Sequence, residues 1–372
     1  MRKSKIFYKD GRNTRVLIAP LDWGLGHTTR CIPIIKQLIQ LECKIYIIAD
    51  KQSFSLLKKE FPDSVILRYK GYEIKYSRQK KRFVVKLILQ VPRVLFRIWN
   101  EKKYLKKVIK THKIDAVISD NRFGMHHKNI PSIYITHQLF IKTGNRFTEY
   151  IAQKIHHYFI KKFDTCWVPD EENNGLAGEL SHPKKLPPNV VYLGPLSRFS
   201  NIQNEDDIYD LLVILSGPEP QRTIFEALVL AQMQDLEGSI LLVRGLPDET
   251  TKPAGFKNVV IENHLTANEM NSVLSKSKLV VCRSGYTSVM DLSILGKKAI
   301  LIPTPGQTEQ EYLARYLSEK QYFLSESQEN FSIKAAIEKA QSFQFKKADL
   351  EPEKFKKITG ELVAYLKTRK SK

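Results

Sequence analysis

The chain has 372 residues, of which 42% are apolar and 10% aromatic, enough for two domains with separate cores. Its formal net charge of +21 is uneven, because residues 1–200 carry +22 and residues 201–372 carry −1. Positive charge gathered in one half favours an anionic partner, such as a nucleic acid, an acidic glycan or an anionic lipid surface. No run of about 18 uncharged apolar residues occurs, which argues against a membrane-spanning helix.

The cysteines and the N-terminal residues indicate a reducing compartment. The first ten residues are basic and contain no long apolar run, so no secretory signal is predicted. The four cysteines have no metal-ligand spacing and lie in or beside apolar runs: Cys31, Cys43, Cys166 and Cys282. We therefore expect a cytoplasmic protein, either free or peripheral on the inner face of the membrane.

Short apolar runs alternate with amphipathic segments along most of the chain, the pattern of parallel βαβ units. In the first half, strands are predicted at 15–19, 44–49, 114–119, 132–136 and 164–168, with helices at 28–41 and 53–60. A polar, turn-rich linker is predicted at 193–207. After it, strands are predicted at 210–215, 239–243, 259–262, 279–282 and 299–303.

The alternation predicts an α/β protein with two doubly wound, Rossmann-like domains that face a central cleft. The expected boundaries are 1–197 for a basic first domain and 198–350 for a second domain. Residues 351–372 form a basic C-terminal helix that is able to cross back to the first domain. Ligands of such sheets bind at the carboxyl ends of the strands.

The most informative segment follows the predicted strand 279–282. A Ser284-Gly285 turn leads there into a helix that begins near Thr287. The N–H groups at a helix start converge on one point, which suits a phosphate. Asp291 is within reach of an attached sugar hydroxyl, and Gln310-Glu311 follows 19 residues later. The segment predicts a nucleotide or nucleotide-sugar site; the alternative is a turn that only ends the strand.

A glycine-containing loop precedes the first predicted helix. Gly24 and Gly26 let the backbone approach a phosphate or an acceptor closely, and His27 stands at the helix start. A histidine there is a candidate general base, because its pKa is close to working pH, or else a capping residue. Asp22 and Asp120, also at predicted strand ends, are rival bases, and Asp120 is equally consistent with a turn or cap.

The second half repeats the arrangement of strand, glycine turn and helix at Ser216-Gly217. Arg222 and Arg198 are able to supply positive charge to a diphosphate, since the planar guanidinium matches phosphate oxygens. The alternative for each arginine is a solvated surface position.

Two histidine pairs, His126-His127 and His156-His157, invite a metal interpretation. Adjacent helical residues do not face one another, and no Cys or Glu completes a ligand set. No metal site is predicted.

The positive charge peaks between residues 68 and 113, where 16 basic residues accompany only two acidic ones. Apolar residues recur there at helical spacing, which favours an amphipathic helix lying in an anionic membrane surface. The rival is a helix that packs on its own domain through the same apolar stripe. Nucleic acid is disfavoured, because no binding module is recognisable. The predicted membrane residues are Lys80, Lys81, Arg82, Phe96 and Trp99.

With these motifs in place, the chain resembles the GT-B glycosyltransferases, especially family 28, which includes the MurG-like enzyme of peptidoglycan precursor synthesis and the diacylglycerol glycosyltransferases. The resemblance is strongest over residues 277–314, where the Cys-Arg-Ser-Gly turn, Asp291 and Gln310-Glu311 follow the order of the family's donor site. It extends more weakly to 216–222, 194–198 and 24–27.

The resemblance implies roles for these positions. Asp291 would bind the ribose hydroxyls in place of the usual Glu, and Gln310 would contact the donor sugar, with Glu311 where a second Gln is common. The backbone near Leu265 would face the uracil. The diphosphate and its surroundings would involve Ser216, Gly217, Arg222, Arg198, Arg283, Ser284, Gly285, Tyr286 and Thr287.

The implied activity is a metal-independent, inverting transfer of a hexose or N-acetylhexosamine from a UDP-sugar to a glycan or lipid-linked acceptor in cell envelope synthesis. The Glu311 position and the Pro305-Gly306 loop leave the donor sugar open. Two alternatives remain at this point. One is a UDP-sugar epimerase or hydrolase of the same fold, and the other is a non-catalytic binder of anionic lipid or nucleic acid.

Overall fold

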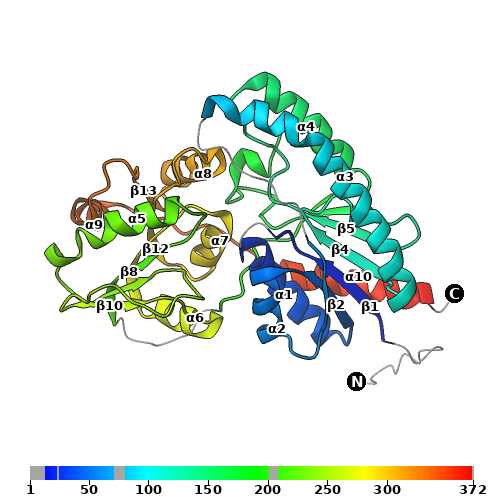
Figure 1. Ribbon diagram of the computed structural model, residues 1–372, viewed down its shortest axis with the longest axis horizontal. Coiled ribbons are helices and arrows are strands. Elements are labelled where there is room, and N and C mark those ends of the chain that lie inside the picture. The colour runs from blue at the N-terminus through cyan, green and yellow to red at the C-terminus, as the bar shows by residue number, and fades with distance from the viewer. Residues whose placement is uncertain (1–12, 23–24, 71–79, 201–207, 371–372) are drawn as a thin grey trace.

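The computed structural model describes residues 13–22, 25–70, 80–200 and 208–370, with residues 80–92 and 370 described by their backbone alone. Two α/β domains lie side by side, each with helices on both faces of a parallel sheet (Figure 1). The predicted fold class is therefore confirmed. Gly24, predicted in the first loop, and the side chains of Lys80, Lys81 and Arg82 lie outside the described residues.

The first domain has a sheet of parallel strands in the order β3-β2-β1-β4-β5-β6-β7. Its central strands are buried on both faces, which explains their uninterrupted apolar runs. The strands are β1 (Arg15–Ala19), β2 (Lys44–Ala49), β3 (Val65–Arg68), β4 (Ala116–Asp120), β5 (Ser132–Ile135), β6 (Thr165–Val168) and β7 (Val190–Tyr192). The helices are α1 (Leu25–Gln40), α2 (Lys51–Glu60), α3 (Lys80–His112) and α4 (Arg146–Ile160).

The second domain repeats this topology with the order β10-β9-β8-β11-β12-β13. Its strands are β8 (Tyr209–Ile214), β9 (Ile240–Val243), β10 (Val259–Glu262), β11 (Ser277–Cys282), β12 (Lys298–Leu301) and β13 (Leu324–Ser325). Its helices are α5 (Gln221–Leu230), α6 (Ala267–Ser275), α7 (Tyr286–Ile294), α8 (Thr308–Glu319) and α9 (Ile333–Ser342). In each sheet the chain begins at a central strand, adds strands toward one edge, and then returns to add strands on the other side. In such sheets, ligands bind at the carboxyl ends of the strands where this change of direction occurs.

Three strands were not predicted. The strands β3, β7 and β13 occupy the outer positions of their sheets and are only two to four residues long, so they carry little periodic signal. Helix α1 begins at Leu25, three residues before the predicted start, so Gly26 and His27 belong to its first turn.

The two domains share one apolar core at their junction. Tyr286, Met290 and Tyr312 of the second domain belong to the same buried cluster as Leu176 and Leu196 of the first. Polar contacts frame this cluster. The Tyr286 hydroxyl donates to the Pro169 carbonyl at 2.8 Å, and the Tyr316 hydroxyl donates to the Gly175 carbonyl at 2.9 Å. These contacts hold the carboxyl ends of both sheets toward each other.

The C-terminal helix α10 (Lys354–Lys370) packs on α1 of the first domain. Its buried residues Phe355, Thr359, Val363 and Leu366 recur every three or four positions, which places them on one helical face. The Arg369 guanidinium also donates to the Asn129 carbonyl at 2.8 Å.

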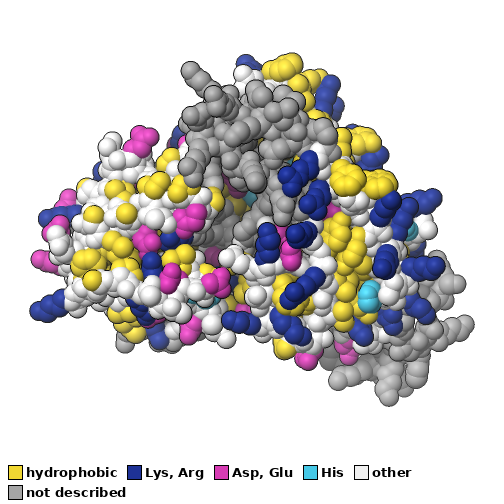
Figure 2. Space-filling model, in the orientation of Figure 1, with side chains coloured by type: hydrophobic (Ala, Val, Ile, Leu, Met, Phe, Trp, Pro, Cys, Tyr) yellow, Lys and Arg dark blue, Asp and Glu magenta, His cyan; other side chains and the backbone are white. Residues whose placement is uncertain are grey.

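Helix α3 is anchored by one buried ion pair. Glu101 accepts from Arg122 Nε at 2.8 Å and from the Gly124 amide at 3.0 Å, and both charged side chains are almost fully buried. Basic and apolar side chains interleave on the visible surface of this domain, whereas acidic ones gather on the other (Figure 2). Among the residues that the structure describes, no helix is long and apolar enough to cross a membrane.

Replacing Gly124 by alanine should destabilise the protein. The added Cβ would lie 2.5 Å from the Ile98 carbonyl oxygen and 2.4 Å from Glu101 Cβ, so α3 must shift. Overpacking of this kind costs about 1–3 kcal/mol. Denaturant unfolding measures the change. Gly360→Ala is the matched control, because nothing lies within 4 Å of its Cβ and alanine in mid-helix should add about 0.5–1 kcal/mol of stability. Equal effects of the two substitutions would contradict the packing described for α3.

Candidate active site

Two helix N-termini meet at the domain junction. Helix α1 begins after β1 and α7 begins after β11, and the Thr287 hydroxyl donates to the Gly26 carbonyl at 3.3 Å. A Cβ at Gly26 would lie 3.1 Å from Thr287 Oγ1, so glycine permits this approach. Both N-termini carry a partial positive charge, and together they suit a diphosphate.

His27, in the first turn of α1, points at Asp120 at the end of β4. Its Nδ1 lies 2.9 Å from Asp120 Oδ1. Asp120 is fully buried, and Arg30 donates to both of its carboxylate oxygens. Arg30 Nη2 lies 2.8 Å from the same Nδ1, so Nδ1 is held between a carboxylate oxygen that accepts and a guanidinium nitrogen that donates. Among the described residues, none hydrogen-bonds to Nε2. His27 and Asp120, two rival bases in the sequence, are therefore partners.

The surroundings keep His27 neutral. Burial lowers the pKa of His27, Asp120 opposes this, and the Arg30 cation adds to the lowering. Burial raises the pKa of Asp120, but the charges and hydrogen bonds of Arg30 and His27 outweigh it and hold that pKa well below its usual range. A neutral imidazole fixed by an ionised carboxylate is able to accept a proton.

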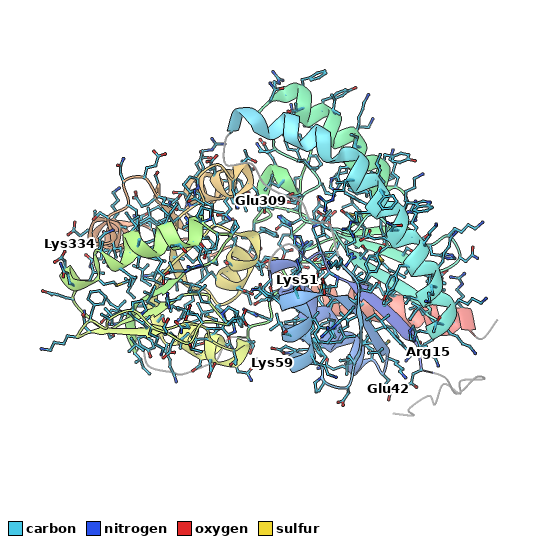
Figure 3. The ribbon with its side chains drawn as sticks, viewed as in Figure 1. Arg15, Glu42, Lys51, Lys59, Glu309 and Lys334 are labelled. Carbon is cyan, nitrogen blue, oxygen red and sulfur yellow. The ribbon has the colours of Figure 1, made fainter. Side chains whose placement is uncertain are left out.

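The second domain reaches this group through α8. Glu309, in the first turn of α8, lies 2.8 Å from His137 Nε2, and His137 Nδ1 lies 2.9 Å from Arg30 Nη1. Glu309 stands at the junction between the domains (Figure 3). The ring of Tyr286 stacks on His137, with centroids 4.3 Å apart and planes at 12°.

Asp291 lies at the junction as well, in the interior of α7. It is buried, accepts from the Ser197 hydroxyl at 2.5 Å and is close to the Arg198 guanidinium. Burial raises its pKa to about 6, although Arg198 and Ser197 both act to lower it. The structure thus brings the predicted ribose ligand Asp291 together with Arg198.

A polar cluster occupies the carboxyl ends of β8, β11 and β12. Gln310 accepts from the Thr304 amide at 2.9 Å, and the Ser284 hydroxyl donates to the Gln310 carbonyl at 2.9 Å. The Ser216-Gly217 turn is adjacent, since a Cβ at Gly217, whose φ is +104°, would lie 3.8 Å from Thr304 Oγ1. The structure therefore groups the predicted diphosphate and sugar residues, with Gly285 as the N-cap of α7.

Three of the predicted donor-site residues have other partners in the structure. Arg283 is buried, stacks on Phe225 and donates to the carbonyls of Ile302, Pro303 and Gln221, so its guanidinium holds loops together. Arg222 is bound by Glu219 and Glu226. The Tyr286 side chain is buried against the first domain, which leaves only its backbone for a phosphate.

Asp22 is also engaged, because Arg122 Nη1 lies 3.9 Å from its carboxylate. This pairing makes Asp22 a weaker base candidate than His27. One histidine of the two adjacent pairs is a packing residue. His156 is buried beside Phe123 and Tyr134, and burial lowers its pKa to about 3.

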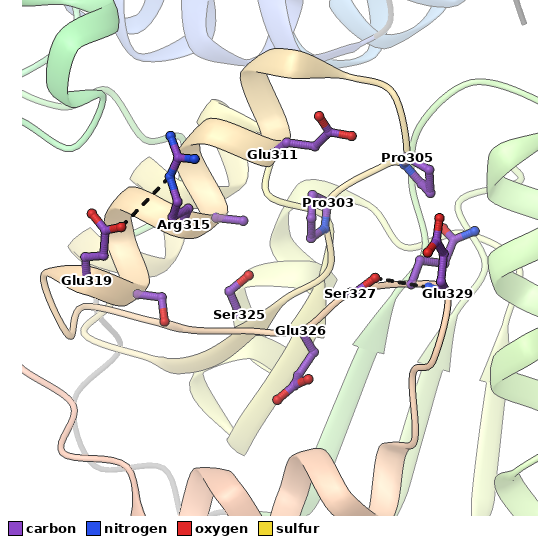
Figure 4. A pocket seen from close by; sticks show the side chains of 12 residues that line it. Pro303, Pro305, Glu311, Arg315, Glu319, Ser325, Glu326, Ser327 and Glu329 are labelled. Atoms are coloured by element: carbon purple, nitrogen blue, oxygen red, sulfur yellow. Dashed lines mark hydrogen bonds and ion pairs between the residues drawn. The ribbon is translucent and has the colours of Figure 1, made fainter. Parts of the chain in front are cut away.

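Glu311 faces a different hollow. Its Oε1 accepts from the Gly306 amide at 2.8 Å. Glu311 lines a cavity of about 520 Å³ between α8 and the segments 303–305 and 325–329 (Figure 4). Glu319, Glu326 and Glu329 line the same cavity, and four carboxylates disfavour a diphosphate there. The cavity contains none of His27, Asp120 or Asp291. Leu265, predicted near the uracil, is half-buried just before the capping box of α6.

Sequence reasoning missed Arg30, His137, Gln138 and Glu309 as members of this group. One signal was available for His137 and Gln138: they follow β5, at the same sheet edge as Asp120. Arg30 is one helical turn after His27, but an arginine in an apolar helix gives no indication of its partner.

Comparison with known proteins bears on this site. Residues 212–364 match the family model of the glycosyltransferase family 28 C-terminal domain. An uncharacterized glycosyltransferase of Methanosarcina acetivorans is 23% identical over 83% of this chain and 84% of its own length. The UDP-N-acetylglucosamine--N-acetylmuramyl-(pentapeptide) pyrophosphoryl-undecaprenol N-acetylglucosamine transferase of Desulforudis audaxviator is 40% identical, over 19% of this chain and 18% of that protein.

The fold is found in solved structures. The glycotransferase of kitacinnamycin superposes with a TM-score of 0.63 at 12% identity, covering 96% of this chain and 99% of that one. Such a likeness establishes the two-domain GT-B fold.

Asp291→Asn should stabilise the protein in a pH-dependent way. The folded state raises the Asp291 pKa to about 6, so Asp291 ionises less readily in the folded protein than in the unfolded chain. Below the pKa of the unfolded chain this has no effect on the free energy of unfolding, and above it wild type loses stability as the pH rises. Relative to wild type, the free energy of unfolding of the variant should rise by about 3 kcal/mol between about pH 4 and pH 7.5. Denaturant unfolding at both pH values checks this.

Asp210→Asn is the control of opposite sign. A hydrogen bond from Lys278 and others from Ser239 hold the Asp210 pKa below its usual value. This substitution should therefore lower stability at neutral pH. An Asp291→Asn effect that does not change with pH would contradict the burial described for Asp291.

Proposed function

We propose that this family 28-like glycosyltransferase of the GT-B fold moves a hexose or N-acetylhexosamine from a UDP-sugar to a hydroxyl of a glycan or lipid-linked acceptor, with inversion and without a metal ion. One observation carries the proposal: the His27–Asp120 pair of the first domain faces the N-terminus of α7 in the second. A base and an anion-binding helix start, contributed by different domains, suit transfer between two substrates.

The donor assignment rests on the second domain. Its family match and the name of the Desulforudis relative, a UDP-N-acetylglucosamine transferase, support a UDP-sugar. Asp291 would accept hydrogen bonds from the ribose once Ser197 turns away, and Gln310 would contact the sugar. The diphosphate would lie between the Ser216-Gly217 turn and the start of α7, with the uracil near Leu265.

The reaction would use the His27 tautomer whose Nδ1–H donates to Asp120 and whose Nε2 has a free lone pair. Nε2 takes the proton of the acceptor hydroxyl, and the oxygen attacks the anomeric carbon on the face opposite the diphosphate. The bond from that carbon to UDP breaks, and UDP leaves with the electron pair, which inverts the anomeric centre. Because Arg222 and Arg283 are engaged elsewhere, the N-termini of α1 and α7 would stabilise the leaving charge.

Acceptor binding and membrane contact would belong to the first domain. Helix α3 buries Ile98, Leu105 and Val108 against its own sheet, as the packing alternative requires, yet leaves Phe96 60% and Trp99 50% exposed. Helix α4 joins α3 through Phe159 and Val94. Exposed apolar residues of both helices form what we call the α3–α4 face: Leu95, Phe96, Trp99, Phe147, Tyr150, Ile151, Ile155 and Tyr158.

Lysines accompany these rings, which suits an anionic lipid surface. Lys103 Nζ lies 3.4 Å from the Trp99 centroid, and Lys154 and Lys162 lie 4.4 and 4.3 Å from Tyr150 and Tyr158. Aromatic rings with lysine ammonium groups over their faces favour the interface between headgroups and acyl chains. We propose that this face holds the enzyme on the inner side of the membrane, where a lipid-linked acceptor is accessible.

Two alternatives carry different expectations. An epimerase or hydrolase would consume a UDP-sugar without an acceptor, and Glu309 is a carboxylate close to His27 and His137. A non-catalytic binder of anionic lipid or nucleic acid would bind no nucleotide-sugar. Nucleotide-sugar binding and transfer assays distinguish the transferase from these two alternatives.

Thermal unfolding with a panel of nucleotide-sugars tests the donor site. Sugar-transfer assays test the assignment of the base. A UDP-sugar at a hundredfold excess over Kd should add about 2.7 kcal/mol of stability. Asp291→Ala should lose this shift. His27→Ala should keep it but lower kcat about a hundredfold, because only the proton acceptor is removed.

Normal turnover by Asp291→Ala would contradict the donor assignment. Rapid consumption of a UDP-sugar in the absence of any acceptor would favour the epimerase or hydrolase. Failure of every nucleotide-sugar to bind would favour the non-catalytic binder.

Replacing Phe96 and Trp99 together by serine should weaken binding to vesicles that contain phosphatidylglycerol about tenfold or more, since two exposed rings among the described side chains of α3 are lost. Co-sedimentation measures this, with phosphatidylcholine vesicles as the neutral comparison. Tyr365→Ser is the control, because Tyr365 is 55% exposed on the distant helix α10. Vesicle binding that survives the double substitution would exclude this face as the membrane contact.

A further inference from the structure

Glu309 makes a contact across the domain junction that the proposed mechanism does not use. It belongs to the second domain, at the second residue of α8, and its carboxylate meets two residues of the first domain that follow β5. His137 Nε2 lies 2.8 Å from Oε1, and Gln138 Nε2 donates to Oε2. Both carboxylate oxygens are therefore bound by the other domain.

The hydrogen bonds of this contact have a defined direction. Arg30 can only donate, so His137 Nδ1 accepts from Arg30 Nη1, and the proton of the neutral ring is on Nε2. Nε2–H therefore donates to Glu309. His137 thus connects the Glu309 carboxylate to the same guanidinium that binds Asp120.

The contact is embedded in a tight interface. His137 is buried and stacked on Tyr286, which removes its rotational freedom. The Thr308 hydroxyl beside Glu309 donates to the Lys142 carbonyl at 2.9 Å, and the Tyr312 hydroxyl accepts from the Glu179 amide at 2.8 Å. These contacts tie the first turns of α8 to the first domain, and they exist only while the two domains stay together.

We propose that Glu309 is a positioning residue that couples domain closure to the base: through His137, Arg30 and Asp120 it fixes the orientation of His27. The inference rests on the proposed function for the identity of the base. When the domains separate, Glu309 and the ring of Tyr286 leave His137, so the orientation of His137 and its hydrogen bond from Arg30 are no longer fixed. The His27–Asp120 pair is then less well fixed.

Electrostatics act in the same direction as geometry. The charged and titratable groups around His27 are Asp120 on β4, Arg30 on α1, His137 after β5 and Glu309 on α8. Glu309 is the only one of these four from the second domain. Its negative charge favours the imidazolium that forms during proton transfer, so closure strengthens the base at the moment when both substrates are enclosed.

Three variants test the coupling. Glu309→Ala removes both hydrogen bonds and the charge. Gln138→Glu alone places two carboxylates against each other and should open the contact. Gln138→Glu combined with Glu309→Gln restores it, because the amide at position 309 accepts from His137 and donates to the carboxylate at position 138. Glu319→Gln, at a 67% exposed position of the same helix, is the matched control.

The His27 signals in NMR of protein with isotope-labelled histidine are the primary measurement, taken without substrate and assigned with His27→Asn. In Glu309→Ala the His27 pKa should fall, because a nearby negative charge is lost. In both Glu309→Ala and Gln138→Glu the His27 ring signals should shift, whereas the combined variant and Glu319→Gln should match wild type. In transfer assays the two single variants should lower kcat about tenfold with donor KM within about twofold, and the combined variant should recover to within about threefold.

Unchanged His27 signals in Glu309→Ala overturn the proposal, even if transfer is lost, because Glu309 would then act on a substrate directly. Failure of the combined variant to restore the signals also overturns it. Absence of any sugar transfer by wild type would refute the proposed function alone, since the NMR measurement needs no substrate.

Discussion

The ion pair between Asp120 and Arg30 is the constraint on which the site depends. Both side chains are buried, and a buried carboxylate is tolerated only with charge and hydrogen bonds around it. Arg30 supplies these from one face of α1, His27 adds a hydrogen bond, and the Cys31 thiol lies 3.7 Å away. Because Asp120 ends a central strand, the rigid sheet and not the loop before α1 decides where His27 points.

The two domains share a strand order but contribute differently to the junction. The first supplies the titratable groups, which are held by β4, β5 and α1. The second supplies two helix starts, α7 and α8, whose aromatic residues Tyr286 and Tyr312 seal the interface. The apolar contact brings the helices close, and the polar groups at its edge define their register. Chemistry at this junction therefore requires both domains at once.

Much of the architecture could be predicted from the sequence, because fully apolar strands and their glycine turns are local signals. Pairings across long sequence distances could not. His27 and Asp120 are 93 positions apart and Glu309 and His137 are 172 apart, so each was considered separately or overlooked. Arg222 was expected at the diphosphate because arginine suits phosphate, and Arg283 because of the family resemblance. Their partners Glu226 and Phe225 lie nearby in the sequence or the fold, but only tertiary packing reveals the preference.

The return of α10 to the first domain has a consequence for biosynthesis. Helix α10, which is synthesised after the whole second domain, covers α1, the helix that carries His27 and Arg30. Until then, the apolar face that Phe355, Val363 and Leu366 will cover stays open, although the first sheet is already complete in sequence. The second domain is able to form earlier from contiguous chain, whereas the first must wait. The core of the first domain is thus completed only after the second domain has been synthesised.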